Sequence, residues 1–308
     1  MKNFINISDH SSSDLRAIID EAKTRKLSRK GFNKSAPDDD KPFEGKSMAM
    51  IFEKPSTRTR MSFDIAAKQL GGSSIILNPD GIHYGKGDET LKDTAKVLTE
   101  YVDIVMLRTS SHKNLEEFGK HLDIPIINGL SDKSHPCQIM SDILTYEETN
   151  GLITGKTVSW LGDGDNNMSN SLIEAAGKFK FNLRIGCPKK YAPGKKILGW
   201  SKKNKVNLLI TQKPDEAVKN SDCVMTDKWV SMNDKVNKKT KKKVLKPFQV
   251  NKKLMKKANS NAIFMHCLPV GRGEEVTDEV IDGKQSVVWR QALNRVHAQK
   301  SIIKWCLD

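Results

Sequence analysis

The chain has 308 residues, of which 37% are apolar, and it carries a formal net charge of +15 at pH 7. That length fits two domains of medium size, because a domain usually has about 100–200 residues. No run of about 18 apolar residues occurs, which excludes a membrane-spanning helix. The N-terminal stretch MKNFINISDHSSSDL has no apolar signal core, so we expect a cytoplasmic protein.

The five cysteines are widely spaced and form no CxxC pair: Cys137, Cys187, Cys223, Cys267 and Cys306. Their odd number and wide spacing argue against both a disulfide framework and a zinc cage. Free thiols in a reducing compartment fit this pattern best. We therefore expect neither disulfides nor a metal ion.

In the first half of the chain, apolar strand-like runs alternate with segments of helical periodicity. Alternation of this kind predicts a mostly parallel sheet with helices on both faces. The expected strands are residues 46–53, 73–77, 103–108 and 124–127. The expected helices are residues 57–70, 90–102 and 137–148.

The stretch TNGLITGK, residues 149–156, interrupts this pattern with two glycines and an asparagine. The alternation then begins again, with a helix from about 167 and strands at 157–162, 181–186, 206–210, 221–226 and 261–266. A last helix over about 290–307 carries four apolar residues on one side: Leu293, Val296, Ile303 and Leu307.

We predict two doubly wound parallel-sheet α/β domains, with the active site in the cleft between them. Residues 1–148 form the first domain and residues 149–289 form the second. The last helix, residues 290–308, is expected to pack back on the first domain.

Much of the excess positive charge comes from residues 235–257, which hold eleven lysines and no acidic residue. Such a run indicates either a patch that binds nucleic acid or a solvated insertion on a surface loop. The segment has no arginine, and Phe248 is its one aromatic residue that could stack on a base. A solvated loop is therefore the favoured interpretation, and we expect no nucleic-acid partner.

Ligands of open α/β sheets bind beyond the carboxyl ends of the strands. The first expected strand is followed by STRTR, Ser56 to Arg60, which begins a helix. A helix N-terminus offers unpaired N–H groups and a positive dipole end. The hydroxyls of Ser56, Thr57 and Thr59 and the guanidinium of Arg58 complete a phosphate site without the Walker A pattern. The simpler alternative is an N-cap flanked by surface arginines.

Two later strand ends offer further polar groups. Arg108 ends its strand and could face either the ligand or the core. His135 precedes Pro136, a favoured first helical residue, and could donate to a carbonyl oxygen or simply cap the helix. Gln138, one turn later, could bind the same ligand as His135.

In the second half, the stretch LGDGDNNMSNS (161–171) invites a dinucleotide-binding interpretation, but the third glycine of GxGxxG is replaced by Asn167. A loop rich in Asp and Asn suits an amino-acid ligand better. Asp227 follows the strand at 221–226 and could hold an ammonium group or cap a helix. We expect no dinucleotide cofactor.

The stretch FMHCLP places His266 and Cys267 at the mouth of the last strand. A cysteine beside a histidine suggests a thiol nucleophile. Neighbouring residues in a strand point to opposite faces, however, so a polar contact is the better role for Cys267. Zinc lacks a convincing ligand set here.

Five motifs, STRTR, HPCQ, DNNMSNS, DKWVSM and HCLP, together resemble those of the ornithine carbamoyltransferases within the aspartate/ornithine carbamoyltransferase family. The likeness runs from about residue 43 to the C-terminus and is weakest across 187–220 and 234–258. DKWVSM and HCLP point to the ornithine branch. The resemblance implies a homotrimer with active sites between subunits.

The resemblance also implies roles for individual residues. Those that bind carbamoyl phosphate are Ser56, Thr57, Arg58, Thr59, Arg108, His135, Gln138, Cys267, Leu268 and Arg295, with His83 reaching into a neighbouring subunit's site. Those that bind ornithine are Asn167, Asp227, Ser231 and Met232. Those implied in catalysis are Arg58, Arg108, His135, Asp227 and Cys267.

The implied reaction forms L-citrulline and phosphate from carbamoyl phosphate and L-ornithine, for arginine biosynthesis, without a cofactor. Putrescine or aspartate is the alternative acceptor. Aspartate would need extra cations for its second carboxylate, whereas Asp227 and a thiol suit a cationic amine. The family's usual SMG reads Ser231-Met232-Asn233 here. Glycine gives a mobile loop freedom at positive φ, and asparagine tolerates such φ values better than most residues. We expect this change to affect the rate at which the loop closes and not the identity of the ligand.

Overall fold

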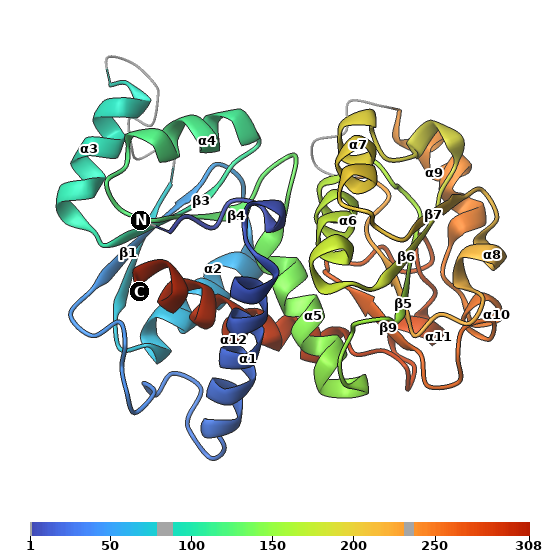
Figure 1. The fold of residues 1–308 in the computed structure, drawn as a ribbon, viewed down its shortest axis with the longest axis horizontal. Coiled ribbons are helices and arrows are strands. Elements are labelled where there is room, and N and C mark those ends of the chain that lie inside the picture. The colour runs from blue at the N-terminus through green and yellow to red at the C-terminus, as the bar shows by residue number, and fades with distance from the viewer. Residues whose placement is uncertain (1, 79–88, 231–236) are drawn as a thin grey trace. The chain divides into compact units, whose positions relative to one another are not determined.

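The computed structural model describes residues 2–78, 89–230 and 237–308. The chain divides into two compact units (Figure 1). The first comprises the residues up to Leu144 together with Leu293–Asp308, and the second comprises Thr145–Ala292. No helix in the described part of the chain is both long enough and apolar enough to cross a membrane.

The described strands of the first unit form one parallel sheet in the order β2-β1-β3-β4. They are β1 (Ser47–Phe52), β2 (Ser73–Leu77), β3 (Ile104–Arg108) and β4 (Ile126–Leu130). The helices of this unit include α1 (Ser12–Ser28), α2 (Thr57–Gln69), α3 (Leu91–Tyr101) and α4 (His112–His121). Helices α5 (Pro136–Asn150) and α12 (Val288–Leu307) each contribute one end to this unit and one end to the other.

Both faces of the first sheet are covered. On one face, Ala49 and Ile51 of β1 pack in a cluster with residues of α3 and α4, among them Leu98 and Phe118. Figure 1 shows α3 and α4 on one side of the sheet and α2 on the other. Because alternate strand residues point to opposite faces, a central strand such as β1 must be apolar almost throughout.

The described strands of the second unit also form one parallel sheet, in the order β7-β6-β5-β8-β9. They are β5 (Thr157–Leu161), β6 (Asn182–Gly186), β7 (Leu208–Thr211), β8 (Cys223–Thr226) and β9 (Ile263–His266). The helices include α6 (Asn167–Phe179), α7 (Lys195–Lys203), α8 (Pro214–Val218), α9 (Lys238–Leu245), α10 (Lys252–Met255) and α11 (Asp278–Ile281). The prediction of two parallel-sheet α/β units is confirmed.

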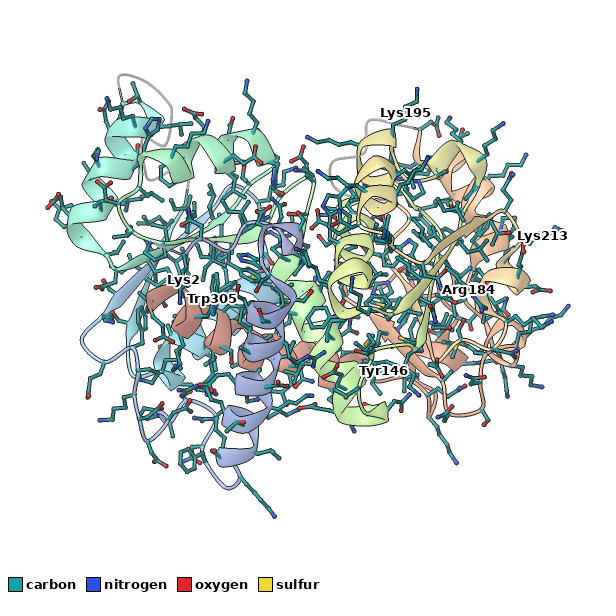
Figure 2. The ribbon with its side chains drawn as sticks, in the orientation of Figure 1. Lys2, Tyr146, Arg184, Lys195, Lys213 and Trp305 are labelled. Carbon is teal, nitrogen blue, oxygen red and sulfur yellow. The ribbon has the colours of Figure 1, made fainter. Side chains whose placement is uncertain are left out.

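The lysine-rich segment is not the solvated loop that its composition suggested. It forms α9, a short 3-10 helix and α10, and it buries Leu245, Phe248 and Leu254. Lysine has good helix propensity, and these buried apolar residues fix the helices to the core of the unit. Elsewhere in the second unit, Lys195 of α7 and Lys213 extend outward (Figure 2).

Several strands begin one or two residues later than expected, and one helix face differs from the expectation. Strand β4 begins at Ile126 rather than at residue 124, because Pro125 has no N–H group to donate to the ladder. In α12, Leu293 is 53% exposed, whereas Val296 and Ile303 are buried. Helical periodicity shows which residues of α12 share a face. It does not show which part of that face other elements cover.

Candidate active site

The candidate residues follow the two strands of each sheet between which the order of strand addition reverses. In the first sheet, β1 and β3 are neighbours, and the chain proceeds outward from them to β2 on one side and β4 on the other. In the second sheet, β5 and β8 have the same relation. Ligands of doubly wound sheets bind at such switch points, beyond the carboxyl ends of the strands. In each unit, the switch point is therefore the place where we expect a small molecule to bind.

The N-terminus of α2 lies at the switch point of the first unit. Ser56 is the N-cap, and its Oγ accepts a hydrogen bond from the N–H of Thr59 at 3.3 Å. The backbone N–H groups of Thr57 and Arg58 have no acceptor within the helix. The Ser56 hydroxyl thus has the capping role of the simpler interpretation, while the first turn of α2 still presents N–H groups to an anion.

Two guanidinium groups converge on the Thr59 hydroxyl. Its Oγ1 accepts hydrogen bonds from Arg108 Nη1 at 3.3 Å and from Arg295 Nη2 at 3.0 Å. All three residues are buried. An irregularity in the register of β3 and β4 lies between Leu107 and Arg108, and such irregularities redirect side chains. The result is a concentrated positive charge at a helix N-terminus.

The two arginines of the STRTR stretch have different environments. Arg60 donates from Nη2 to Asn78 Oδ1 at 2.5 Å, and its guanidinium lies 4.9 Å from the centroid of the Phe52 ring. Arg58 makes no hydrogen bond or ion pair with the described residues, and it is half-buried. Arg58 is thus available to a ligand, whereas Arg60 is held by the protein.

His135 lies close to this positive charge and is itself buried. Burial, followed by the charges of Arg295, Arg108 and Arg58, holds its pKa well below 6.5. His135 is therefore a neutral imidazole at physiological pH. It can donate a hydrogen bond to a carbonyl oxygen, but it adds no charge to the site.

Gln138 stands one turn into α5 and is 1% exposed. Its Nε2 donates to Asp142 Oδ1 at 2.8 Å, which fixes the orientation of the amide. Its Oε1 has no hydrogen-bond partner among the described residues. An oriented, buried acceptor of this kind suits an N–H group of a ligand.

Two supporting residues escaped the sequence analysis. Asn128 of β4 is fully buried and donates from Nδ2 to Ser134 Oγ at 2.9 Å, which holds the loop before His135. Glu53 accepts a hydrogen bond from the N–H of Ser110 at 3.0 Å and so ties the loop after β1 to the loop after β3. An asparagine inside the apolar run IPIINGL was the available signal.

In the second unit, the loop after β5 leads into α6. Gly162 has a φ of +116°, and a Cβ on Gly164 would lie 2.8 Å from the carbonyl oxygen of Tyr191, so both positions favour glycine. Asn166 and Ser169 form a reciprocal capping box, which leaves Asn167 as the first helical residue. These two glycines fit the positive φ and the close packing of this loop.

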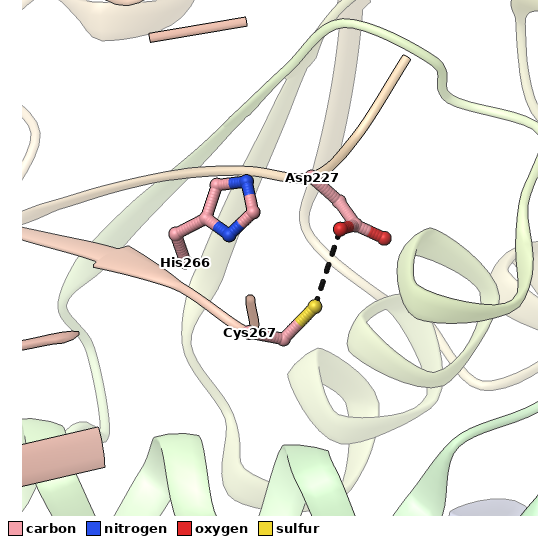
Figure 3. Close-up of side chains that lie close together, drawn as sticks. All are labelled: Asp227, His266 and Cys267. Atoms are coloured by element: carbon pink, nitrogen blue, oxygen red, sulfur yellow. Dashed lines mark hydrogen bonds between the residues drawn. The ribbon is translucent and has the colours of Figure 1, made fainter. Parts of the chain in front are cut away.

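Asp227 follows β8 directly and is half-buried. Its Oδ1 accepts hydrogen bonds from the N–H of Lys228 at 2.7 Å and from Cys267 Sγ at 3.2 Å (Figure 3). No helix begins in the described residues that come next, 228–230, so the structure gives no support to an N-cap role. A carboxylate fixed in this way can bind an ammonium group.

Asp227, His266 and Cys267 lie close together, with one ligand atom of each within 4.8 Å of the others. We had expected His266 and Cys267 to point apart, but β9 ends at His266, so the strand rule does not apply. His266 accepts a hydrogen bond from the N–H of Leu268 at Nδ1 (2.8 Å) and lies 3.2 Å from Glu275 Oε1 at Nε2. His266 could activate Cys267 or bind a metal ion only by breaking one of these bonds.

The structure therefore brings Thr59, Arg108, His135 and Arg295 together in the first unit. It brings Asp227 and Cys267 together in the second. Leu268 adopts a left-handed backbone (φ +58°) next to them. Three predicted site residues, His83, Ser231 and Met232, lie outside the described residues.

Comparison with known families explains this pair of sites. The family model for the carbamoyl-phosphate-binding domain of aspartate/ornithine carbamoyltransferases matches residues 2–148. The model for the aspartate- or ornithine-binding domain of the same family matches residues 154–306. The chain belongs to the aspartate/ornithine carbamoyltransferase family.

Curated relatives in the family match over nearly their whole length. The chain is 49% identical to the ornithine carbamoyltransferase of Brucella ovis over 308 residues, which cover 100% of this chain and 96% of the relative. It is also 49% identical to that of Rhizobium meliloti, with 99% of this chain and 98% of the relative covered.

Solved structures agree with these matches. The ornithine carbamoyltransferase of Pyrococcus furiosus superposes with a TM-score of 0.91 at 41% identity and covers 98% of this chain and 96% of its own. The anabolic ornithine carbamoyltransferase of Campylobacter jejuni superposes with a TM-score of 0.89 at 35% identity and covers 99% of each chain.

Proposed function

We propose that this protein transfers the carbamoyl group of carbamoyl phosphate to the δ-amine of L-ornithine, giving L-citrulline and phosphate. The observation that carries the proposal is the convergence of Arg108 and Arg295 on Thr59, beside a neutral His135 and the N-terminus of α2. This arrangement suits a small molecule with a phosphate at one end and a carbonyl at the other.

The phosphate is bound by the first turn of α2. Its oxygens accept hydrogen bonds from the N–H groups and hydroxyls of the STRTR stretch, and the half-buried guanidinium of Arg58 pairs with its charge. Arg58 suits this role because the described protein groups make no competing hydrogen bond with it. Arg60 does not, because Asn78 and Phe52 hold it.

The carbamoyl group is held by groups of different charge. Negative charge develops on its oxygen as the amine attacks, and buried Arg108 with neutral His135 stabilises that charge. The amide oxygen of Gln138 accepts a hydrogen bond from the carbamoyl NH2 group, since that oxygen has no partner among the described residues. The carbonyl carbon is thereby oriented for attack.

Ornithine is bound by the second unit. Its δ-amine has a solution pKa near that of lysine, about 10.4, and must lose a proton before it attacks. Asp227 orients the amine, and the thiol of Cys267, already 3.2 Å from Asp227, supplies a second polar contact. The proton can leave with the phosphate, so no dedicated protein base is needed. Asn167, at the start of α6, contacts the amino-acid end of ornithine.

The acceptor is ornithine rather than aspartate because the groups at the second switch point are a carboxylate and a thiol. Aspartate would place a second carboxylate against Asp227, and like charges repel at this distance. Putrescine shares the cationic amine of ornithine but lacks its α-carboxylate. The relatives named above are ornithine carbamoyltransferases, which favours ornithine over putrescine.

We propose that the enzyme is a homotrimer that works in arginine biosynthesis in the cytoplasm. The edge strand β2 exposes Ile75 and Ile76, and α2 exposes Met61, so this side of the first unit offers apolar surface to another copy. A neighbouring copy would contribute His83. The five cysteines are free thiols, which suits a reducing compartment. Sedimentation analysis of the purified protein tests the trimer.

One assay tests the proposed function. The purified chain is incubated with carbamoyl phosphate and, in separate reactions, with ornithine, putrescine or aspartate. We expect rapid formation of citrulline and far slower formation of carbamoylputrescine and carbamoylaspartate. Preferential use of putrescine or aspartate would refute the assignment of the acceptor, and no product from any amine would refute the proposal as a whole.

A further inference from the structure

Lys241 differs from the lysines around it in the lysine-rich segment. It is 3% exposed, whereas Thr240 before it on α9 is exposed and Lys242 after it is half-buried. Its Nζ lies 2.6 Å from Asp163 Oδ2 and 5.3 Å from the centroid of the Tyr191 ring. Burying an ammonium group is costly unless it is paired, so this contact is a specific feature and not an incidental surface pair.

Asp163 shapes the loop that leads to Asn167. Its Oδ1 accepts a hydrogen bond from the N–H of Asp165 at 2.9 Å. Its carbonyl oxygen accepts hydrogen bonds from Trp160 Nε1 at 2.8 Å and from Asn166 Nδ2 at 3.1 Å. A residue bound on both its side chain and its backbone fixes the loop from the end of β5 to the N-cap of α6.

The same loop packs against the residues that follow Asp227. A Cβ on Gly162 would lie 3.2 Å from Trp229 Nε1, so the backbone of the loop and the Trp229 indole are in close contact. Trp229 clusters in turn with Tyr191 and with Leu245 of α9. Helix α9 is therefore held to both loops of the second switch point, by Lys241 at the loop after β5 and by Leu245, one turn later on the same helical face, at the loop after β8.

We propose that Lys241, through its ion pair with Asp163, is a positioning residue for ornithine. It fixes the loop that carries Asn167 and neutralises Asp163, a carboxylate that would otherwise add to the negative charge around Asp227. The inference rests on the proposed function and adds to it a role for one residue of the lysine-rich segment. Lys241 itself does not touch the substrate.

The test compares Lys241→Met with three other variants by steady-state kinetics. We expect Lys241→Met to raise the KM for ornithine about tenfold or more, since small misplacements of binding groups cost this much. The KM for carbamoyl phosphate should change less than about twofold, because its proposed site lies in the other unit. Lys241→Arg keeps the charge and should stay close to the wild type. The control Lys243→Met, at an exposed position of the same helix, should have no effect.

Lys241→Met leaves Asp163 buried without its partner and could prevent folding. The double variant Lys241→Met/Asp163→Asn removes both charges and keeps the inference testable in that case. We expect it to fold, as judged by its melting temperature, and to show a KM for ornithine above that of the wild type. A double variant with the wild-type KM for ornithine would overturn the inference, and so would an equal rise in the KM of both substrates.

A third outcome separates a structural role from a positioning role. If Lys241→Met lowers the melting temperature but leaves the KM for ornithine unchanged, the ion pair only stabilises the fold, and the inference is overturned. Wild-type citrulline formation is measured first, because its absence would refute the proposed function. Normal wild-type turnover with an unaffected Lys241→Met variant would refute the role of Lys241 alone.

Discussion

The two units of this protein use positive charge differently. The first has 24 Lys and Arg residues against 22 Asp and Glu, whereas the second has 28 against 15. Yet in the nearly neutral first unit two guanidinium groups, those of Arg108 and Arg295, are buried at one hydroxyl. In the second unit most of the lysines of the lysine-rich segment face solvent.

In this comparison the number of charges does not coincide with the position of the candidate phosphate site. An exposed lysine is solvated and screened by salt, and its interactions are weak. A buried guanidinium has lost its water and binds an anion more strongly. The position of a charge relative to the switch point of the sheet, together with its burial, is therefore the basis on which we predict the site.

The strongest test of this comparison is Arg58→Ala. We expect kcat/KM for carbamoyl phosphate to fall about a hundredfold or more, because a charged group aimed at the phosphate is lost. Arg60→Ala is the matched control from the same stretch, and it should lose far less because Asn78 and Phe52 hold Arg60. Steady-state kinetics measure both variants. Equal losses would show that the two arginines do not differ in function.

The corresponding test in the second unit is Asp227→Asn. We expect kcat/KM for ornithine to fall about a hundredfold, because a neutral amide no longer pairs with the ammonium group. The KM for carbamoyl phosphate should stay near the wild-type value. Asp215→Asn, at an exposed surface pair with Lys257, is the control and should have no effect. An unchanged dependence on ornithine in Asp227→Asn would contradict its role.

A smaller effect concerns stability, and it arises from a buried histidine of the first unit. Burial, followed by the charges of Lys300, Lys26 and Arg29, lowers the pKa of His297 to about 3. Below pH 6.5 His297 binds a proton in the unfolded chain but not in the folded chain. The free energy of unfolding therefore falls as the pH falls. This group should account for a loss of about 2 kcal/mol between pH 7 and pH 5.

Denaturant titrations at pH 7 and pH 5 measure this contribution. The variant His297→Gln, which cannot take up the proton, should lose about 2 kcal/mol less than the wild type over that interval. The absolute stability of the variant does not matter for this comparison. An identical loss in the two proteins would mean that His297 is protonated as easily in the folded state as in the unfolded state.

The smallest effect is expected at the exposed lysines of the second unit. Replacing Lys239, Lys243 and Lys246 with Met together should change turnover less than about twofold, because solvated surface charges contribute little. The same variant and the wild type are titrated with RNA at several salt concentrations. Tight binding by the wild type with a steep salt dependence, lost in the variant, would show that this surface binds nucleic acid after all.

Much of the fold could be predicted from the sequence. The strands of both sheets are short apolar runs that follow a helix and precede a loop, and the order of strands and helices predicted two parallel sheets. Helices α1, α4 and α7 were missed, as were the short helices α8, α10 and α11, and α9 was hidden by the number of its lysines. The spacing from Lys241 to Leu245 and Phe248 is that of one helical face, and it was the available signal for a buried lysine.

The sequence predicted which residue types lie at the strand ends of the candidate site. It did not predict which of these residues contact one another. The hydrogen bond between Thr59 and Arg295 joins residues 236 positions apart, which no local pattern can indicate. Within each motif, one residue caps a helix and another is predicted to bind a substrate. Ser56 caps α2 and Asn166 caps α6, whereas we predict that Arg58 and Asn167 nearby bind the substrates. The roles of these residues toward the substrates stay predictions, as does a single active site formed by the two units.

The Thr59 hydroxyl accepts from two guanidinium groups at once. A hydroxyl oxygen has two lone pairs, so both are engaged and its own hydrogen has a single direction left. The rotation that a serine or threonine hydroxyl usually retains is therefore already frozen before any substrate arrives. The rotational entropy of this hydroxyl is therefore lost when the chain folds and not when a substrate binds. The O–H bond of Thr59 is oriented before binding.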